Sequence, residues 1–115
     1  MTKEESGSDR VSVLQGTLHL LVLKVLTDGP AHGHGISRRL GELSRDWLQV
    51  DEGSLYPCLY RMEKRGWIRS EVRASENNRR ARYYALTSKG WEQFRVEHEN
   101  WRNFNRVVEE ILEGA

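Results

Sequence analysis

The chain has 115 residues, of which 30% are charged, and a formal net charge of +1. A chain of this length is expected to form one domain. Its single cysteine, Cys58, excludes an internal disulfide and a thiolate metal cluster. No apolar run approaches the ~20 residues that span a bilayer, and the start, MTKEESGSDR, lacks the apolar segment of a signal peptide. We therefore expect a cytoplasmic protein with a disordered tail over residues 1–10.

Basic residues gather in the middle of the chain. Residues 51–82 hold eight Lys and Arg against five Asp and Glu, whereas residues 83–115 hold four against six. A local excess of this kind favours an anionic partner for the middle segment.

Two helices are predicted in the first part of the chain. Residues 14–26, LQGTLHLLVLKVL, are apolar almost all round, which is typical of a helix covered on both sides. The Gly-Pro pair that follows ends this helix. A second helix is predicted from Ile36, Leu40 and Leu43, which are spaced four and three apart. Residues 47–50, WLQV, are too short for a helix and are interpreted as a small strand.

The stretch DEGSLYPCLYRMEKRGWI, residues 51–68, predicts a third helix that contains a proline. Asp51 and Ser54 are both candidate N-caps. With Ser54 as the cap, Pro57 would occupy the third helical position, where no intrahelical amide bond is lost, and we interpret the proline as marking the helix start. At 100° per residue, apolar side chains share one face and polar or aromatic side chains share the opposite face. The apolar face holds Leu55, Leu59 and Met62, and the opposite face holds Ser54, Pro57, Tyr60, Arg61 and Lys64.

A β-hairpin and a last helix are predicted after Gly66, which ends the third helix. WIRSEV and RARYYAL, residues 67–72 and 80–86, are rich in aromatic and β-branched residues. They flank ASENNR, whose two asparagines tolerate left-handed turn conformations. Thr87 is expected to cap a helix that runs over residues 88–113.

Three helices followed by a basic hairpin are the element order of a winged helix-turn-helix. The predicted fold is mainly α with a small β-hairpin wing, over residues 11–86, plus a long C-terminal dimerisation helix over residues 87–115. In this motif the third helix enters the major groove and the hairpin lies along the phosphates. Arginine can fork onto guanine, hydroxyls can reach phosphates or bases, and proline suits a thymine methyl. The candidate DNA-binding residues are Ser54, Tyr56, Pro57, Tyr60, Arg61, Lys64, Arg73, Asn77, Asn78, Arg79, Arg80 and Arg82.

Two other interpretations of this surface stay open. Tyr56 and Tyr60 can be half-buried core residues whose hydroxyls reach solvent. The arginines of the hairpin can serve only to prevent its edge from pairing with another chain. The basic surface can also meet an acidic protein in place of DNA. We favour DNA because the helix and the hairpin occur together, and salt-dependent binding to arbitrary duplex DNA would separate the two partners.

Three motifs resemble those of a known family. GTLHLLVLKVLTDGPAHGHGI, EGSLYPCLYRMEKRGWI and RRARYYALTSKG follow one another with the order and spacing of the DNA-binding domain of PadR-like transcriptional regulators. The resemblance covers residues 14–90. It implies a homodimeric repressor of the short subtype with one C-terminal helix, whose third helix and wing bind a palindromic operator. The hairpin SENNRRARYY resembles that of the acidobacterial-type subgroup.

The last helix is expected to form the dimer. Its apolar residues alternate three and four apart, and the first helix is expected to assist because it is so apolar. His98 and Asn105, at seam positions, would fix the register of the two helices. The expected dimerisation residues are Leu14, Leu18, Leu21, Trp91, Phe94, His98, Trp101, Phe104, Asn105, Val108, Ile111 and Leu112.

Trp101 is also a candidate wall of a ligand pocket at the dimer interface. It lies between His98 and Asn105, and aromatic walls with a few polar groups are typical of ligand pockets. The resemblance supports a small planar or aromatic effector, because some short PadR-like regulators bind drugs or phenolic compounds between their subunits. The alternative is that Trp101 is a dimer-core residue only, which is the commoner role of an aromatic stripe at helical spacing.

The histidines and carboxylates give no strong indication of a metal site or of catalysis. His32 and His34 flank a glycine in PAHGHG, and without a carboxylate pair or cysteine at ligand spacing they are expected to cap or solvate a helix start. GHG lacks the lysine and the preceding strand of a phosphate loop. Cys58 lies at the edge of the buried face of the third helix and is interpreted as structural, and Glu63 and Glu71 have no visible partner. We predict no metal, no cofactor and no enzymatic activity.

Overall fold

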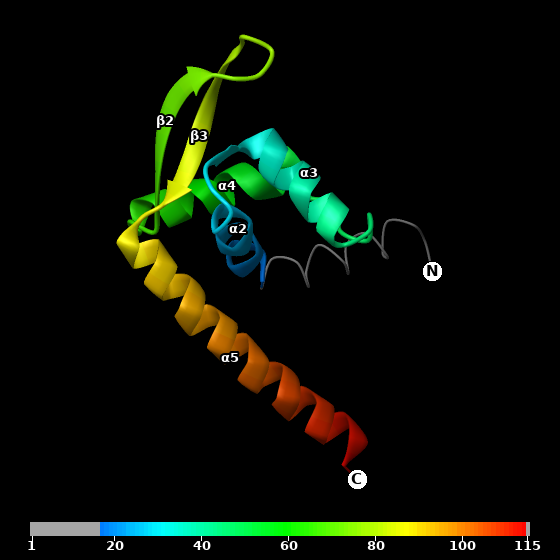
Figure 1. Ribbon diagram of the computed structural model, residues 1–115. Helices are drawn as coiled ribbons and strands as arrows, with labels where there is room; N and C mark the ends of the chain where they lie inside the picture. Colours follow the sequence, from blue (N-terminus) through cyan, green and yellow to red (C-terminus); the bar gives the residue numbers. More distant parts are fainter. Residues whose placement is uncertain (1–16, 115) are drawn as a thin grey trace.

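The computed structural model describes residues 17–114 and places them in a mainly helical fold with one small sheet (Figure 1). The sheet is antiparallel and has the strand order β1-β3-β2. The elements, in chain order, are α2 (Leu18–Leu26), β1 (Ala31–His32), α3 (Gly33–Leu43), α4 (Glu52–Lys64), β2 (Ile68–Ala74), β3 (Arg80–Leu86) and α5 (Ser88–Glu113). The predicted fold class, a winged helix-turn-helix followed by a long helix, is confirmed. In the described part of the chain, no helix combines the length and apolar character needed to cross a membrane.

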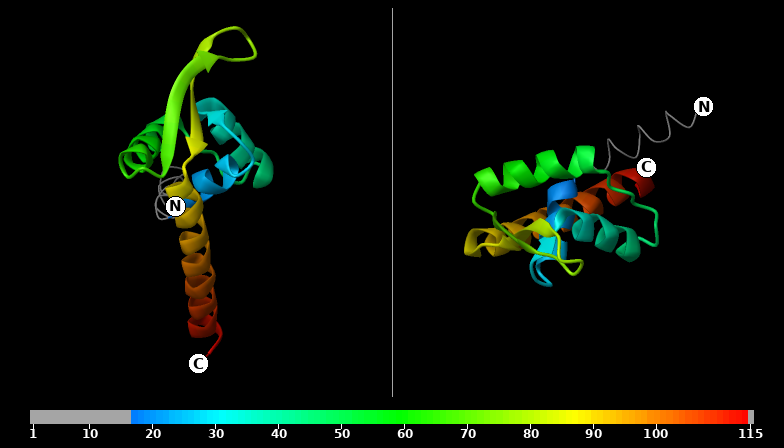
Figure 2. Two further views of the ribbon diagram at one scale, coloured as in Figure 1. Left: turned by 60° about the vertical axis from the view of Figure 1, so that its left-hand side comes forward. Right: turned by 90° about the horizontal axis from the view of Figure 1, so that it is seen from above.

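The helix α2 forms the centre of the hydrophobic core. It contacts α3, α4 and α5, and Figure 2 shows it lying among these three helices. This arrangement explains why the segment is apolar almost all round, as the sequence predicted. The predicted helix start at Leu14 lies outside the described residues. The buried residues of α2 are Leu18, Val22, Leu23, Val25 and Leu26.

One predicted strand is wrong, and another strand was not predicted. Residues 47–50 do not form a strand. The short strand β1 occurs earlier in the chain and pairs with β3, so that Ala31 lies opposite Tyr84 and His32 opposite Tyr83. Two residues are too few to show an alternating pattern, and β1 is therefore defined by its pairing with a distant strand.

Local hydrogen bonds explain why residues 47–50 stay irregular. The amide of Asp46 donates to the carbonyl of Gly41 at 2.8 Å, and the amide of Leu48 donates to Ser44 Oγ at 3.0 Å. These bonds hold residues 46–48 close to the end of α3 and satisfy the amides of Asp46 and Leu48 locally. Val50 is buried in the core without being part of a strand.

The strands β2 and β3 form the predicted hairpin. Ile68 lies opposite Leu86 and Ala74 lies opposite Arg80, with an uninterrupted register between them. At the turn, Asn78 adopts φ 60°, the left-handed conformation that asparagine tolerates. Figure 1 shows the hairpin extending away from the helical core as a wing.

The last helix, α5, begins where the sequence predicted. Thr87 Oγ1 accepts a hydrogen bond from the amide of Gly90 at 3.0 Å and donates to the carbonyl of Gly66 at 2.6 Å. The cap of α5 is therefore tied to the turn that follows α4. From this point α5 runs away from the sheet, with its first turns packed beside α2 and its last turns extending beyond the other described helices (Figures 1 and 2).

Candidate nucleic-acid interface

Of the two predicted N-caps of α4, Asp51 and Ser54, the structure shows Asp51. Asp51 is the N-cap, because its Oδ1 accepts a hydrogen bond from the amide of Ser54 at 2.8 Å. Pro57 is therefore the sixth residue of the helix, and the interpretation of the proline as a marker of the helix start is wrong. Because proline has no amide hydrogen, the carbonyl of Gly53 loses its usual helical donor. In return, an apolar ring stands on the exposed side of α4.

The two faces of α4 separate as the sequence predicted. Leu55, Leu59 and Met62 are buried against the core. Cys58 joins them, with its sulfur 3.6 Å from that of Met62. The helix therefore has one face that holds the fold and one that is free for a partner. On the free side Tyr56, Pro57, Tyr60, Arg61 and Lys64 are exposed and Ser54 is half-buried.

The two tyrosines of this surface are placed differently. The ring of Tyr60 is exposed, and the Lys64 ammonium lies 5.5 Å from its centroid, so this pair presents a cation beside an aromatic ring. Tyr56 packs against the start of α3, where a Cβ added to Gly33 would lie 2.6 Å from the tyrosine hydroxyl oxygen. Its side chain is 43% exposed. Both tyrosines are thus exposed, and Tyr56 differs from Tyr60 in resting against the start of α3.

Two arginines of the hairpin are engaged by neighbouring side chains. The guanidinium of Arg73 lies 4.1 Å from the ring centroid of Tyr83, and one of its nitrogens lies 3.8 Å from Glu71 Oε1. Arg82 Nη1 donates to Ser70 Oγ at 3.0 Å. These contacts restrain both guanidinium groups on the strands of the wing.

The other arginines of the hairpin lie beside its turn. Arg79 and Arg80 are exposed, and their side chains form no hydrogen bond or ion pair with residues 17–114. Asn77 and Asn78, also exposed, belong to the turn, which is closed by a 2.6 Å hydrogen bond from the amide of Ser75 to the carbonyl of Arg79. The wing tip therefore offers two positive charges and two amide side chains to a partner.

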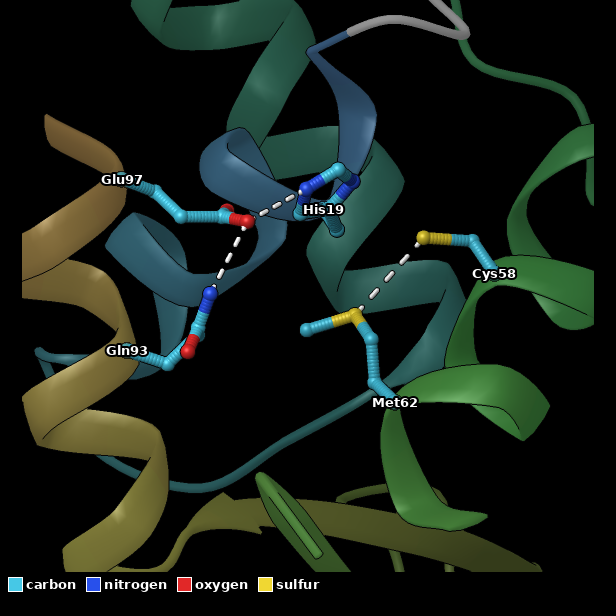
Figure 3. A network of polar contacts seen from close by, with 5 residues as sticks. All are labelled: His19, Cys58, Met62, Gln93 and Glu97. Carbon is cyan, nitrogen blue, oxygen red and sulfur yellow. Dashed lines mark hydrogen bonds and ion pairs between the residues drawn. The ribbon is translucent and has the colours of Figure 1, made fainter. Parts of the chain in front are cut away.

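A polar network joins α2 to α5 (Figure 3). His19 Nε2 lies 2.7 Å from Glu97 Oε1, and the same oxygen accepts from Gln93 Nε2 at 3.1 Å. The second oxygen of Glu97 is buried and has no donor within residues 17–114. The His19 ring also lies 5.9 Å from the ring of Trp67. His19 therefore links the core helix to α5 and to the start of the hairpin.

Trp101 lines an open hollow between α2 and α5, beside this network. The ring centroids of Trp101 and Phe104 are 6.4 Å apart. The two residues predicted to share a pocket with Trp101, His98 and Asn105, do not line the hollow. The ring of His98 stacks on Phe94 with centroids 5.7 Å apart, and Asn105 is exposed. The hollow has a volume of about 220 Å³ and is lined by Thr17, His19, Leu20, Glu97, Asn100, Trp101 and Phe104.

The residues predicted to form the dimer divide between the core and the surface. Leu18 is buried in the core of its own chain and has no surface to offer to a second copy. Leu21 and Phe94 pack partly against the same core. Leu14 lies outside the described residues. The rest belong to α5, where Trp91, Trp101, Phe104, Asn105, Ile111 and Leu112 are exposed and His98 and Val108 are half-buried.

His32 caps the start of α3, which is one of the roles that the sequence suggested for the histidines of PAHGHG. His32 Nδ1 accepts a hydrogen bond from the amide of Gly35 at 2.9 Å, and the His34 ring stacks beside it with centroids 6.3 Å apart. Within residues 17–114 no three His, Cys, Asp or Glu side chains are grouped so that they would hold a metal. Burial raises the pKa of the Cys58 thiol, which disfavours its reactive thiolate form.

A family model matches the part of the chain that carries this surface. The model of the transcriptional regulator PadR-like family matches residues 22–96, which include α3, α4 and both strands of the wing. The chain belongs to the PadR-like family of transcriptional regulators. Family membership implies a role in regulating transcription by binding DNA, and the relatives of named class are transcriptional regulators. The acidobacterial-type subgroup stays a prediction.

Relatives of the chain are found among both sequences and solved structures. The transcriptional regulator Rv3488 of Mycobacterium tuberculosis is 31% identical over 100 residues, which are 87% of each chain. A transcriptional regulator from Clostridium thermocellum is 25% identical with a TM-score of 0.81, covering 89% of this chain and 99% of that one. A PadR family transcriptional regulator from Eggerthella lenta is 27% identical with a TM-score of 0.80, covering 97% of this chain and 96% of that one.

Sequence reasoning missed two contacts that shape the surface. Gly33 provides the space for Tyr56, and a glycine in the first turn of a helix that also contains Gly35 gives no local sign of such a role. Glu63 and Ser70 form a hydrogen bond between α4 and β2 at 2.7 Å. The hairpin face to which Ser70 belongs could be found from strand alternation once the register was known.

Proposed function

We propose that the protein is a sequence-specific DNA-binding transcriptional regulator whose α4 enters the major groove. The observation that carries this proposal is the free face of α4, where Tyr60, Arg61 and Lys64 are exposed while the opposite face is buried. A major groove about 12 Å wide admits a helix of this kind. Family membership supports the regulatory role. A chromosomal DNA target also implies a cytoplasmic location.

Arg61 is the proposed base reader. It is exposed near the centre of the free face and has no hydrogen bond or ion pair with the described residues. Its fork of N–H donors matches the O6 and N7 acceptors of guanine. The hydroxyls of Ser54, Tyr56 and Tyr60 can reach phosphates or bases, and the ring of Pro57 can meet a thymine methyl.

The wing is proposed to follow the phosphate backbone. Arg79 and Arg80 carry the free charges of the wing tip, and Asn77 and Asn78 add amide donors to the same end. Contacts of this kind position a protein on DNA without selecting a sequence. Arg73 lies further down the hairpin, where its charge adds to the positive field of the wing.

The proposal is tested with operator DNA selected from a random pool by the purified protein. Arg61→Ala should lose roughly 1–3 kcal/mol on the selected site and little on random DNA. Arg80→Ala should weaken both and reduce the slope of log Kd against log salt by about one. Equal losses on both DNAs for Arg61→Ala would remove its role as a base reader. Absence of salt-dependent binding to any duplex would favour a protein-interaction module.

We also propose that the regulator is a homodimeric repressor that binds a palindromic operator. The exposed apolar residues of α5 support this, because Phe104, Ile111 and Leu112 are 62%, 70% and 74% exposed in the single chain. Soluble monomers rarely expose a continuous apolar stripe of this kind. A two-fold dimer would place the recognition helices roughly one DNA turn apart, ~34 Å, and would require an inverted repeat. His98 and Asn105 would help to fix its register.

A small planar or aromatic effector is proposed to bind in the hollow beside Trp101. Two aromatic rings with the polar groups of Glu97 and Asn100 are the mixture that ligand sites use. The hollow adjoins the contact between His19 and Glu97, so an occupant would act where the DNA-binding part meets α5.

Flat aromatic compounds can be titrated while tryptophan emission and operator binding are followed together. Quenching and DNA release that both disappear in a Trp101→Leu variant that still dimerises would support the site. Absence of a response to a broad set of compounds would leave Trp101 as a packing residue.

A further inference from the structure

A chain of hydrogen bonds joins the recognition helix to both strands of the wing. Ser70 Oγ, on β2, donates to Glu63 Oε2 of α4 at 2.7 Å. The same oxygen accepts from Arg82 Nη1 of β3 at 3.0 Å. A single hydroxyl therefore connects three elements, and it uses both its donor and an acceptor position.

The register of the hairpin explains why these groups meet. Ser70 lies opposite Tyr84, and Arg82 lies opposite Val72, so Ser70 and Arg82 are diagonal neighbours on one face of the two strands. Tyr84 is buried on that face, which packs toward α4. Arg73, by contrast, belongs to the opposite face, where it covers Tyr83.

The contact also balances charge at the side of α4. Glu63 is exposed and carries a carboxylate on a helix that is proposed to approach DNA phosphates. The guanidinium of Arg82 reaches this carboxylate through Ser70, and the three groups together present little net charge. Arg80, on the same hairpin face, has no such partner among the described residues, so its charge is available to a DNA phosphate.

We infer that Arg82 is a positioning residue and not a phosphate contact. Together with Ser70 and Glu63, it fixes the angle between the wing and α4, and hence the distance along DNA between groove contacts and wing contacts. This inference rests on the proposed DNA-binding function. It reassigns one of the arginines that the sequence placed with the DNA contacts.

Salt dependence separates the two roles of an arginine. Removing a phosphate contact lowers the slope of log Kd against log salt by about one, because fewer counterions are released. Removing a positioning residue weakens specific binding but leaves the slope unchanged. Arg82→Gln should therefore weaken operator binding about three- to tenfold, the effect of losing one ordinary hydrogen bond, at unchanged slope. Arg80→Gln, the matched control, should lower the slope.

Substitutions at the other two members of this hydrogen-bonded series, Ser70 and Glu63, give a second readout. Ser70→Ala should weaken operator binding to a similar extent, and adding Arg82→Gln to it should cause little further loss because both changes break one contact. Glu63→Gln keeps an acceptor oxygen for the Ser70 hydroxyl and should retain most of the binding, whereas Glu63→Ala should not. A lowered salt slope for Arg82→Gln, with Ser70→Ala binding like wild type, would overturn the inference.

A measurement without DNA tests the contact independently of the proposed function. Residual dipolar couplings of backbone amides report the orientation of β2 and β3 relative to α4. In Ser70→Ala, the hairpin couplings should fit the wild-type orientation less well, while those within α4 stay unchanged. Unchanged couplings in both elements would overturn the inference that the contact of Ser70, Glu63 and Arg82 fixes the angle of the wing. If wild-type protein binds no duplex DNA but the couplings change as expected, the positioning role of this contact stands and the DNA-binding function fails.

Discussion

Gly90 occupies a position where α5 crosses the residues that follow α4. A Cβ at this position would overlap the carbonyl oxygen of Trp67 and lie 3.0 Å from a methyl of Leu86. That carbonyl also accepts the amide of Thr87 at 3.1 Å, which holds it in place. We expect Gly90→Ala to lower the free energy of unfolding by about 1–3 kcal/mol in urea denaturation. The matched control is Gly41→Ala, whose Cβ would meet nothing nearer than 3.6 Å, and equal losses in the two variants would contradict this explanation.

The burial of Cys58 should make the free energy of unfolding fall as the pH is raised into the alkaline range. Burial raises the pKa of its thiol, so the folded state holds the proton more tightly than the unfolded state. The resulting stabilisation is complete below the unfolded pKa, about 8.5, and is lost as pH rises through the folded pKa. Between pH 7 and 10, the free energy of unfolding of wild type should fall more steeply than that of Cys58→Ala. Tyr84, whose pKa burial also raises, is common to both proteins. Parallel pH profiles would contradict the prediction.

The interior proline of α4, Pro57, lowers the stability of the helix and places an apolar ring on its exposed face. Proline in a helix interior costs up to about 3 kcal/mol, because it removes an amide donor and crowds the preceding turn. Pro57→Ala restores a donor for the Gly53 carbonyl and should raise the free energy of unfolding by about 1 kcal/mol or more. The same change should weaken binding to the selected operator, because the proposed contact with a thymine methyl is reduced. A less stable variant in urea denaturation would show that the helix is already adapted to the proline.

Elements defined by local periodicity were predictable, and those defined by distant pairing were not. The buried face of α4 follows from the helical repeat of Leu55, Leu59 and Met62, which needs no knowledge of the neighbours. The strand β1 exists only because it pairs with β3, and no pattern of two residues reveals this. The contact between Ser70 and Arg82 depends in the same way on the register of the hairpin. Leu18 shows a further limit, because its apolar side chain fits a dimer surface as well as the core that actually buries it.

At the scale of the whole molecule, the described chain is elongated, with principal extents of 56 × 37 × 23 Å. A helix of 26 residues is about 39 Å long at 1.5 Å per residue, so α5 accounts for much of the longest dimension. Its first turns pack beside α2, whereas its last turns carry exposed apolar side chains. The helix thus connects the DNA-binding part to a surface that a second copy would cover.

A charge placed on this surface should therefore dissociate the dimer. Leu112→Glu introduces a carboxylate on the apolar stripe, where burial without a partner is unfavourable, and the dimer dissociation constant in analytical ultracentrifugation should rise by at least about tenfold, or 1.4 kcal/mol. Asn103→Glu adds the same charge nine positions earlier, on the opposite face at 100° per residue, and should leave the dimer intact.

The Leu112→Glu variant should lose affinity for an inverted repeat but not for an isolated half-site, because each copy keeps its own α4 and wing. Equal weakening by the two variants, or a wild-type chain that is monomeric at micromolar concentration while binding the inverted repeat, would rule out α5 as the dimerisation element.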